Sequence, residues 1–143
     1  MRVRIKRIDK SLPLPEYKTK GAACFDFTAR VAETILPKEI KYVPLNVAIE
    51  HPESHMLIMA ARSSLHKKGL MLANNVAIGD TDFSGNEDEY RAALYNFTDK
   101  PVTIEKGERI TQGFFRKYDR AEWEEVDDLS AESRGGFGST GLV

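Results

Sequence analysis

Cysteine is almost absent from this chain, which carries one, Cys24, among its 143 residues. A lone cysteine excludes an internal disulfide framework, and it cannot by itself form the cysteine cluster of a structural zinc site. The simplest setting for such a composition is a reducing compartment. We therefore expect a cytoplasmic location.

An excess of one charge and a long apolar run are missing as well. Lysine and arginine total 21, aspartate and glutamate total 22, and the formal net charge is −1. This balance gives no overall field that attracts nucleic acid or an anionic membrane. No apolar stretch approaches the roughly 18 residues of a spanning helix, and the opening MRVRIKRIDK lacks the apolar segment typical of a secretory signal. We expect neither direct nucleic-acid binding nor membrane association, so any anion site has to be local.

Short segments that alternate apolar and polar residues are abundant instead. With 41% apolar and 30% charged content, the chain is typical of one globular domain. Proline, glycine, asparagine and aspartate separate the segments, which favours strands. The strand candidates cover residues 3–8, 39–50, 55–61, 89–97, 101–118 and 121–126, and only residues 63–68 and a stretch near Ser130 look helical. The pattern predicts an all-β protein, a jelly-roll-like sandwich or barrel of short strands with one short helix.

A change in composition near Ala121 divides the chain. Acidic residues follow it and lead into the end SRGGFGSTGLV, where four of the ten glycines lie between Gly135 and Gly141. We expect a core over residues 1–120 and a flexible glycine-rich C-terminal arm over residues 121–143, within a single domain. The arm also carries an arginine, a ring and two hydroxyls. It is therefore either a frayed terminus or a phosphate-binding nest beside a stacking ring.

Two other segments carry candidate chemistry. DTDFSG begins with Asp80, and carboxylates two residues apart on an extended segment share one side, so one of them is a candidate general base toward water. The alternative is an ordinary turn. ARSSLHKKGL combines the guanidinium of Arg62 with the hydroxyls of Ser63 and Ser64 at a helix start, which is either an anion cradle or plain helix capping.

Two polar residues stand among apolar neighbours. Asp26 interrupts the run between Phe25 and Phe27, and Gln112 lies in RITQGFF where alternation predicts a buried side chain. Buried polar groups are hydrogen-bonded in folded proteins. We therefore expect both residues to have polar partners.

Five segments, in order, resemble the five motifs of the trimeric dUTP diphosphatase (dUTPase) family. They are ACFDFTA, ARSS, NNVAIGDTDF, GERITQ and GGFGSTG, and they run from Gly21 to Gly141. The resemblance implies a β jelly roll that forms a homotrimer, with active sites shared between subunits and an arm that closes over a neighbour's site. It also implies Mg²⁺-assisted hydrolysis of dUTP to dUMP and diphosphate, which supplies dUMP and limits uracil incorporation into DNA.

The same resemblance implies a role for single residues. Asp80 would activate the attacking water, Asn74 would read the uracil edge, and Phe83 would pack under the deoxyribose. Asp26 would order water around Mg²⁺, which the substrate phosphates would mainly hold. Phe137 would stack on the uracil. The residues expected to bind the phosphates are Arg62, Ser63, Ser64, Gln112, Arg134, Ser139 and Thr140.

Some positions depart from the family pattern. Cys24 and Ala77 stand where glycine is usual, Gly79 stands where an apolar residue usually precedes the base, and Arg134 lies two residues beyond the commoner arginine position. A glycine at position 79 is expected to loosen the backbone that aims Asp80. Two alternatives therefore stay open: a dCTP deaminase-like enzyme, and a non-catalytic nucleotide-binding or regulatory module on the same fold.

Overall fold

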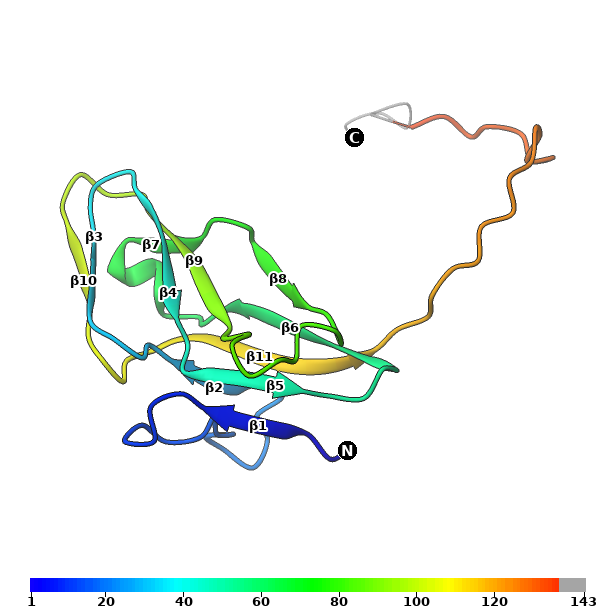
Figure 1. Cartoon of the computed structure of the whole chain (residues 1–143). Helices are drawn as coiled ribbons and strands as arrows, with labels where there is room; N and C mark the ends of the chain where they lie inside the picture. The colour runs from blue at the N-terminus through cyan, green and yellow to red at the C-terminus, as the bar shows by residue number, and fades with distance from the viewer. Residues whose placement is uncertain (137–143) are drawn as a thin grey trace.

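The computed structural model describes residues 1–136, which are built almost entirely from short strands (Figure 1). In this range the elements are β1 (Arg4–Arg7), β2 (Phe25–Thr28), β3 (Glu33–Ile35), β4 (Ile40–Pro44), β5 (Val47–Glu50), β6 (His55–Ala61), the 3₁₀ helix η1 (Leu65–Lys68), β7 (Leu70–Leu72), β8 (Val76–Gly79), β9 (Arg91–Asn96), β10 (Val102–Ile104) and β11 (Arg109–Lys117). The all-β prediction is confirmed, and η1 lies inside the predicted helical segment. No helix among these residues is long and apolar enough to cross a membrane.

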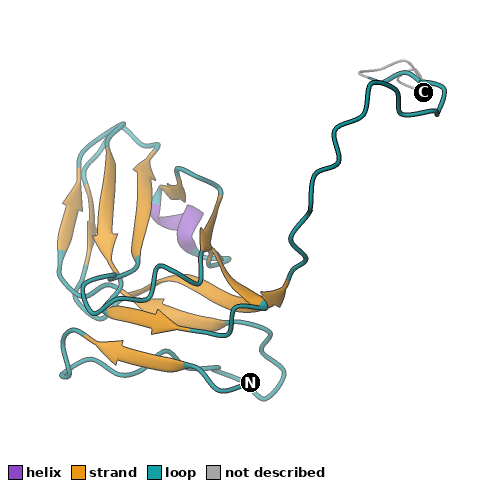
Figure 2. Cartoon of the chain, turned by 45° about the vertical axis from the view of Figure 1, so that its right-hand side comes forward, coloured by secondary structure: helices purple, strands orange, loops and turns teal. Residues whose placement is uncertain are grey.

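The strands form antiparallel sheets that pack over a common core (Figure 2). One sheet has the order β2-β11-β6-β8, and a second has the order β4-β9-β7. Two smaller pairs, β1-β5 and β10-β3, complete the described part of the chain. Neighbours in the sheets are far apart in the sequence, which is the arrangement expected of a jelly roll rather than of successive hairpins.

The core lies between the two larger sheets and follows the two-residue period of their strands. Phe27, Leu57, Leu94 and Ile110 have no exposed surface, and they come from β2, β6, β9 and β11. Burial of each such side chain contributes roughly 1.5–3 kcal/mol. The sheet that carries both Phe27 and Ile110 is therefore a rigid base for any polar group on its other face.

β7 and β8 follow each other in the chain but belong to different sheets. β7 pairs with β9, whereas β8 pairs with β6. Because β7 and β8 do not pair with each other, no backbone ladder joins β8 to the sheet that contains β9. A gap therefore remains between β8 and β9. The segment from Asn74 to Phe83 therefore borders an opening in the molecule rather than a continuous sheet.

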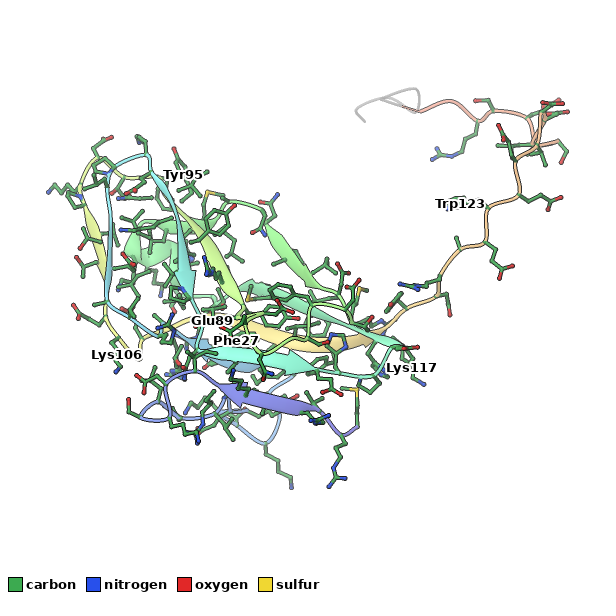
Figure 3. All side chains as sticks on the ribbon, in the orientation of Figure 1. Phe27, Glu89, Tyr95, Lys106, Lys117 and Trp123 are labelled. Atoms are coloured by element: carbon green, nitrogen blue, oxygen red, sulfur yellow. The ribbon has the colours of Figure 1, made fainter. Side chains whose placement is uncertain are left out.

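The chain after β11 leaves the core as an extended arm (Figure 1). The strand predicted over residues 121–126 does not form, and neither does the short helix near Ser130. Trp123, the only tryptophan, is 93% exposed and lies far from the core side chains in Figure 3. An isolated strand has no backbone partner within the chain, so alternation alone is not enough to form one.

Candidate active site

Asp26 is the centre of a charged cluster on the sheet β2-β11-β6. Its Oδ1 accepts a hydrogen bond from Arg62 Nε at 3.1 Å, and its Oδ2 accepts one from Arg109 Nη1 at 2.8 Å. Arg62 Nη1 also donates to the backbone oxygen of Arg109 at 3.0 Å. The Asp26 side chain is only 13% exposed. Two guanidinium groups thus hold one carboxylate, and the cluster keeps an excess positive charge.

Arg109 is a site residue that the sequence prediction missed. The pairing of β11 with β2 shifts register between Arg109 and Thr111, so the strand bulges at this point. Bulges re-aim side chains and are common beside active sites. Arg109 stands in the quoted segment GERITQ, but alternation alone does not show that its side chain turns toward Asp26.

Gln112, Ser63 and Ser64 lie beside this cluster. Gln112 is directly opposite Asp26 in the register of β2 and β11, and its Nε2 donates to the oxygen of Ala61 at 2.9 Å. Both serines are exposed, and Ser64 precedes η1 without a side-chain capping bond in the described chain. Their hydroxyls therefore face solvent rather than the helix. A hollow of about 400 Å³ beside them is lined by Arg62, Ser64, Leu65, Lys67, Lys68, Glu108 and Arg109.

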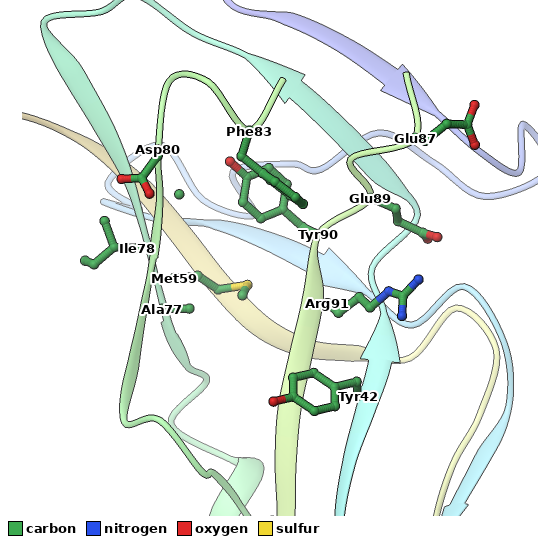
Figure 4. A pocket seen from close by; sticks show the side chains of 11 residues that line it. Tyr42, Met59, Ala77, Ile78, Asp80, Phe83, Glu87, Glu89, Tyr90 and Arg91 are labelled. Atoms are coloured by element: carbon green, nitrogen blue, oxygen red, sulfur yellow. The ribbon is translucent and has the colours of Figure 1, made fainter. Parts of the chain in front are cut away.

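A second hollow, of about 520 Å³, lies in the gap between β8 and β9 (Figure 4). Asp80 directly follows β8 and is exposed at this opening, while Met59 is only 2% exposed below it. The size and the mainly apolar walls suit a small organic ligand. We call this hollow, lined by Tyr42, Met59, Ala77, Ile78, Gly79, Asp80, Phe83, Glu87, Glu89, Tyr90 and Arg91, the β8–β9 pocket.

Gly79 differs from the sequence expectation. It is buried in β8 opposite Leu57, and a Cβ atom there would overlap the hydroxyl oxygen of Tyr90 and stand 2.8 Å from Tyr90 Cε1 and 2.9 Å from Tyr90 Cζ. The glycine is therefore explained by close approach of a ring and not by a looser backbone. Burial, with smaller effects from Asp80 and Asp88, raises the pKa of Tyr90 to about 12, so the phenol is neutral at pH 7.

Asn74 lies in the exposed turn between β7 and β8, six residues before Asp80. Its backbone oxygen accepts a hydrogen bond from Val76 N at 2.6 Å, and the next residue, Asn75, has a φ of 58°. Asparagine tolerates this left-handed conformation better than most residues. The turn thus holds Asn74 at one end of β8 while Asp80 stands at the other.

The polar cluster and the β8–β9 pocket are separate within one chain. Gly79 pairs with Leu57 near the start of β6, whereas Arg62 follows the end of β6 directly. At about 3.3 Å per residue, these five residues correspond to about 17 Å of strand. The structure thus brings Asp26, Arg62 and Gln112 together, but it does not bring Asp80 to them.

The predicted residues of the C-terminal motif are only partly described. Arg134 is exposed in the extended arm. Phe137, Ser139 and Thr140 lie outside the described residues. In the described range, no group of three or more His, Cys, Asp or Glu side chains is placed to hold a metal ion.

Comparison with known proteins shows the family of the chain. The dUTPase family model matches residues 10–141. The chain belongs to the dUTPase family. It is 39% identical to the deoxyuridine 5'-triphosphate nucleotidohydrolase of Rickettsia prowazekii over 98% of this chain and 97% of that one. It is 38% identical to the enzyme of the same name from Dictyoglomus turgidum, over 99% of both chains.

Solved structures agree with this assignment. The crystal structure of the dUTPase from Streptococcus mutans is similar, with a TM-score of 0.76 and 31% identity over 83% of this chain and 98% of that one. Membership of the dUTPase family makes the chain an enzyme that hydrolyses dUTP to dUMP and diphosphate. Its substrate is a nucleotide, and members of the dUTPase family are generally metal-dependent.

Proposed function

We propose that Asp80 is the general base of dUTP hydrolysis. Asp80 takes a proton from water, the water oxygen bonds to the α-phosphorus, and the bond from that phosphorus to the diphosphate oxygen breaks. The products are dUMP and diphosphate. The observation that carries this role is the position of Asp80, an exposed carboxylate at the mouth of an apolar pocket large enough for a nucleoside. A base has to reach the water that it deprotonates, and this place allows it.

The β8–β9 pocket is proposed to hold the base and sugar of the nucleotide. Asn74 supplies amide groups for the uracil edge, and the ring of Phe83, 39% exposed at the opening, packs under the deoxyribose. A fit of apolar surfaces separates ligands that differ by one methyl by only about 1–3 kcal/mol. Selection of uracil over thymine therefore needs a rigid wall, and paired strand backbone supplies one.

The polar cluster is proposed to bind the phosphates. Arg62 can offer its guanidinium, and the exposed hydroxyls of Ser63 and Ser64 and the amide of Gln112 add neutral donors. Arg109 adds positive charge beside them while it also holds Asp26. Donors fixed before the substrate arrives stabilise developing charge without reorganisation.

We infer that Mg²⁺ is the metal and that it binds mainly through the substrate phosphates. The described residues offer no cluster of three acidic or imidazole ligands, and both oxygens of Asp26 already accept from arginines. The site therefore fits a metal carried by the nucleotide, with Asp26 accepting hydrogen bonds from its water ligands. Bound in this way, the metal would supply positive charge that offsets the charge of the leaving diphosphate.

We also propose that each active site is shared between chains of a homotrimer. The Asn74 end of β8 lies toward Arg62, because Val76 pairs with Ala60 at the Arg62 end of β6. A nucleotide with its base at Asn74 and its α-phosphate at Asp80 therefore directs its outer phosphates along β8, away from Arg62 of the same chain. The phosphate-binding cluster must then come from another copy. Symmetric association of identical chains is the common way to provide one.

Two surfaces are suited to this assembly. Ile40, Tyr42 and Met71 are 54%, 65% and 42% exposed on β4 and β7, the two outer strands of the sheet β4-β9-β7. The extended arm carries Trp123 and Leu129, which are 93% and 81% exposed. An arm of this length can carry Arg134, Phe137, Ser139 and Thr140 to a neighbour's site, where they would bind the terminal phosphates and stack on the uracil.

A panel of deoxynucleoside triphosphates tests the function. With Mg²⁺, the protein is expected to release diphosphate from dUTP and not from dTTP, dCTP or dATP, and to release no ammonia from dCTP. Removal of residues 133–143 is expected to abolish turnover and leave the assembly unchanged in size-exclusion chromatography with light scattering. Ammonia from dCTP would instead support a deaminase, and dUTP binding without diphosphate release would support a regulatory module.

A further inference from the structure

The ring of Tyr90 occupies the space beside Gly79, the residue before Asp80. A side chain at position 79 would start 2.8 Å and 2.9 Å from two carbons of that ring, closer than Cβ atoms are found in folded proteins. Tyr90 is only 6% exposed, so its ring cannot swing into solvent to make room. The side chain that supports this end of β8 is therefore supplied by a residue eleven positions later in the sequence.

The same ring also contacts Phe83, at the other end of the turn from Asp80 to Phe83. Phe83 packs edge-on against Tyr90, with ring centroids 5.2 Å apart and an interplanar angle of 78°. Within the turn, Phe83 N donates to the oxygen of Asp80 at 3.3 Å. Figure 4 shows Tyr90 beneath this turn, between β8 and β9. One ring thus contacts the residues on both sides of the proposed base.

Tyr90 is itself held on a rigid part of the fold. Its N–H donates to the oxygen of Val47 and its oxygen accepts from Leu45 N, both at 2.9 Å. The preceding residue, Glu89, accepts two hydrogen bonds from the guanidinium of Arg30, at 2.7 Å and 3.0 Å. Bidentate pairs of this kind fix orientation as well as distance. The backbone of Tyr90 is therefore fixed, and its ring can hold the turn from Asp80 to Phe83 in one position.

The Tyr90 hydroxyl is buried and has no hydrogen-bond partner among residues 1–136. Such a group lowers stability, so packing needs alone would favour phenylalanine at this position. The hydroxyl oxygen is also the atom nearest to the place of a Cβ at Gly79, but two ring carbons, Cε1 and Cζ, contact this place as well and would be present in either residue. Tyr90→Phe therefore removes one contact with Gly79 and keeps the contacts that the ring makes.

We propose that Tyr90 is a positioning residue for dUTP hydrolysis. Its side chain sets the position of Asp80 relative to Phe83, the residue proposed to pack under the deoxyribose. The inference rests on the proposed role of Asp80 as the base. A base displaced by about 1 Å can lose about 100-fold in rate, so a support that touches both flanks of the turn controls turnover more than affinity. Tyr90 acts through Gly79 and Phe83 and does not itself touch the reacting atoms.

The test compares Tyr90→Leu with Tyr90→Phe. Tyr90→Leu keeps an apolar side chain but loses the ring, and we expect kcat to fall between about tenfold and about 100-fold. Affinity for a non-hydrolysable α,β-imido analogue of dUTP, measured by calorimetry, should change less than about threefold, because leucine keeps an apolar side chain at this place in the pocket wall and the other lining residues are unchanged. Tyr90→Phe keeps the ring contacts with Gly79 and Phe83, so its kcat should stay well above that of Tyr90→Leu, with a melting temperature at least as high as that of wild type.

Two further variants separate positioning from loss of stability. Ile104→Ala, in β10 and fully buried, should lower the melting temperature without lowering kcat at 25 °C. Gly79→Ala should lower kcat by pressing on the ring, and the double variant Gly79→Ala with Tyr90→Leu should recover part of that loss. This second pair keeps the proposal testable if Tyr90→Leu does not fold.

Different results overturn different claims. A Tyr90→Leu enzyme that folds and turns over within twofold of wild type rejects the positioning role, as does a Tyr90→Phe enzyme as slow as Tyr90→Leu. Asp80→Asn is measured beside them. If Asp80→Asn keeps its turnover, the proposed base is wrong; if it is inactive while Tyr90→Leu is not, only the inference about Tyr90 fails.

Discussion

The polar cluster around Asp26 and the β8–β9 pocket are held in place by different forces. In the cluster, two guanidinium groups and an amide make hydrogen bonds of 2.8–3.1 Å that fix the functional side chains directly. In the pocket, Asp80 is located by packing of Tyr90 against Gly79 and Phe83. Phosphates need fixed charge, whereas a nucleoside needs a fixed shape, and each region suits the part of the substrate that we propose it to bind.

The contrast predicts how each region fails. A charged cluster loses its function when one partner is removed, because the remaining charges reorganise. A packed pocket tolerates substitutions that conserve shape and fails when volume changes. The variants below compare the two regions, beginning with the largest expected effect.

Asp80→Asn should have the largest effect. The amide cannot accept the proton of the water, and loss of a general base typically costs about 10²–10⁴ in rate. Binding of the α,β-imido analogue should remain within a few-fold, because the pocket shape is conserved. Diphosphate release and calorimetry measure the two quantities, and an Asn variant with wild-type kcat would reject the role of Asp80.

Arg62→Ala should have the next largest effect. It removes hydrogen bonds to charged partners, each worth about 1.5–3 kcal/mol, which corresponds to about tenfold to 150-fold in kcat/KM. Arg62→Lys keeps the charge but not the planar fork, so it should lose less than Arg62→Ala and still fall short of wild type. Steady-state kinetics with dUTP measure both, and an Arg62→Lys enzyme as active as wild type would contradict the need for a planar guanidinium at this position.

Mixing the Asp80→Asn and Arg62→Ala variants should restore activity. If Asp80 and Arg62 of one site come from different chains, equal amounts of Asp80→Asn and Arg62→Ala, unfolded and refolded together, should give about one quarter of the wild-type sites. Each variant refolded alone is the control. Activity no greater than the average of the two controls would mean that one chain provides both residues.

Assembly should also change the environment of Trp123. The side chain is 93% exposed in the single chain, and it is the only tryptophan. Docking of the arm on another copy would bury it, so its emission should lie at shorter wavelength at micromolar concentration and shift to longer wavelength on dilution. Trp123→Phe gives the background. An unchanged, solvent-like emission at all concentrations would argue against docking of this part of the arm.

The smallest effect concerns the phenol of Tyr90. Burial raises its pKa to about 12, so the folded state keeps the proton while the unfolded chain loses it near the ordinary value of about 10. The stabilisation is complete below pH 10 and is lost as the pH rises from about 10 to about 12. The free energy of unfolding should therefore fall more steeply over this range in wild type than in Tyr90→Phe. Tyr42→Phe, in the same pocket but 65% exposed, is the matched control.

The polar cluster could be predicted largely from sequence. Asp26 and Gln112 each stood in an apolar context that called for a partner, and both have one. The signal was local, because each polar residue stands among apolar neighbours in the sequence, although Asp26 lies on the face of β2 opposite to Phe25 and Phe27. Arg109 could not be predicted in the same way, because the direction of its side chain depends on a bulge that alternation does not reveal.

The pocket could be predicted only in part. Asp80 and Phe83 were found from a local motif, but the contact between Gly79 and Tyr90 joins two strands and has no local signal. The separation of Asp80 from Arg62 likewise depends on the register of β6 with β8. The strand predicted at residues 121–126 was wrong for the same reason, because alternation describes a strand's faces but not its partner.

The close approach of Tyr90 to Gly79 makes these two positions mutually dependent in evolution. A substitution that is neutral at one of them depends on what occupies the other, so a chain cannot exchange Gly79 for a larger residue until Tyr90 has been replaced by a smaller one. The order of changes is therefore constrained, and a residue grafted at position 79 from a relative would be harmful alone. Transfer of sequence features between such enzymes has to move both positions as one unit.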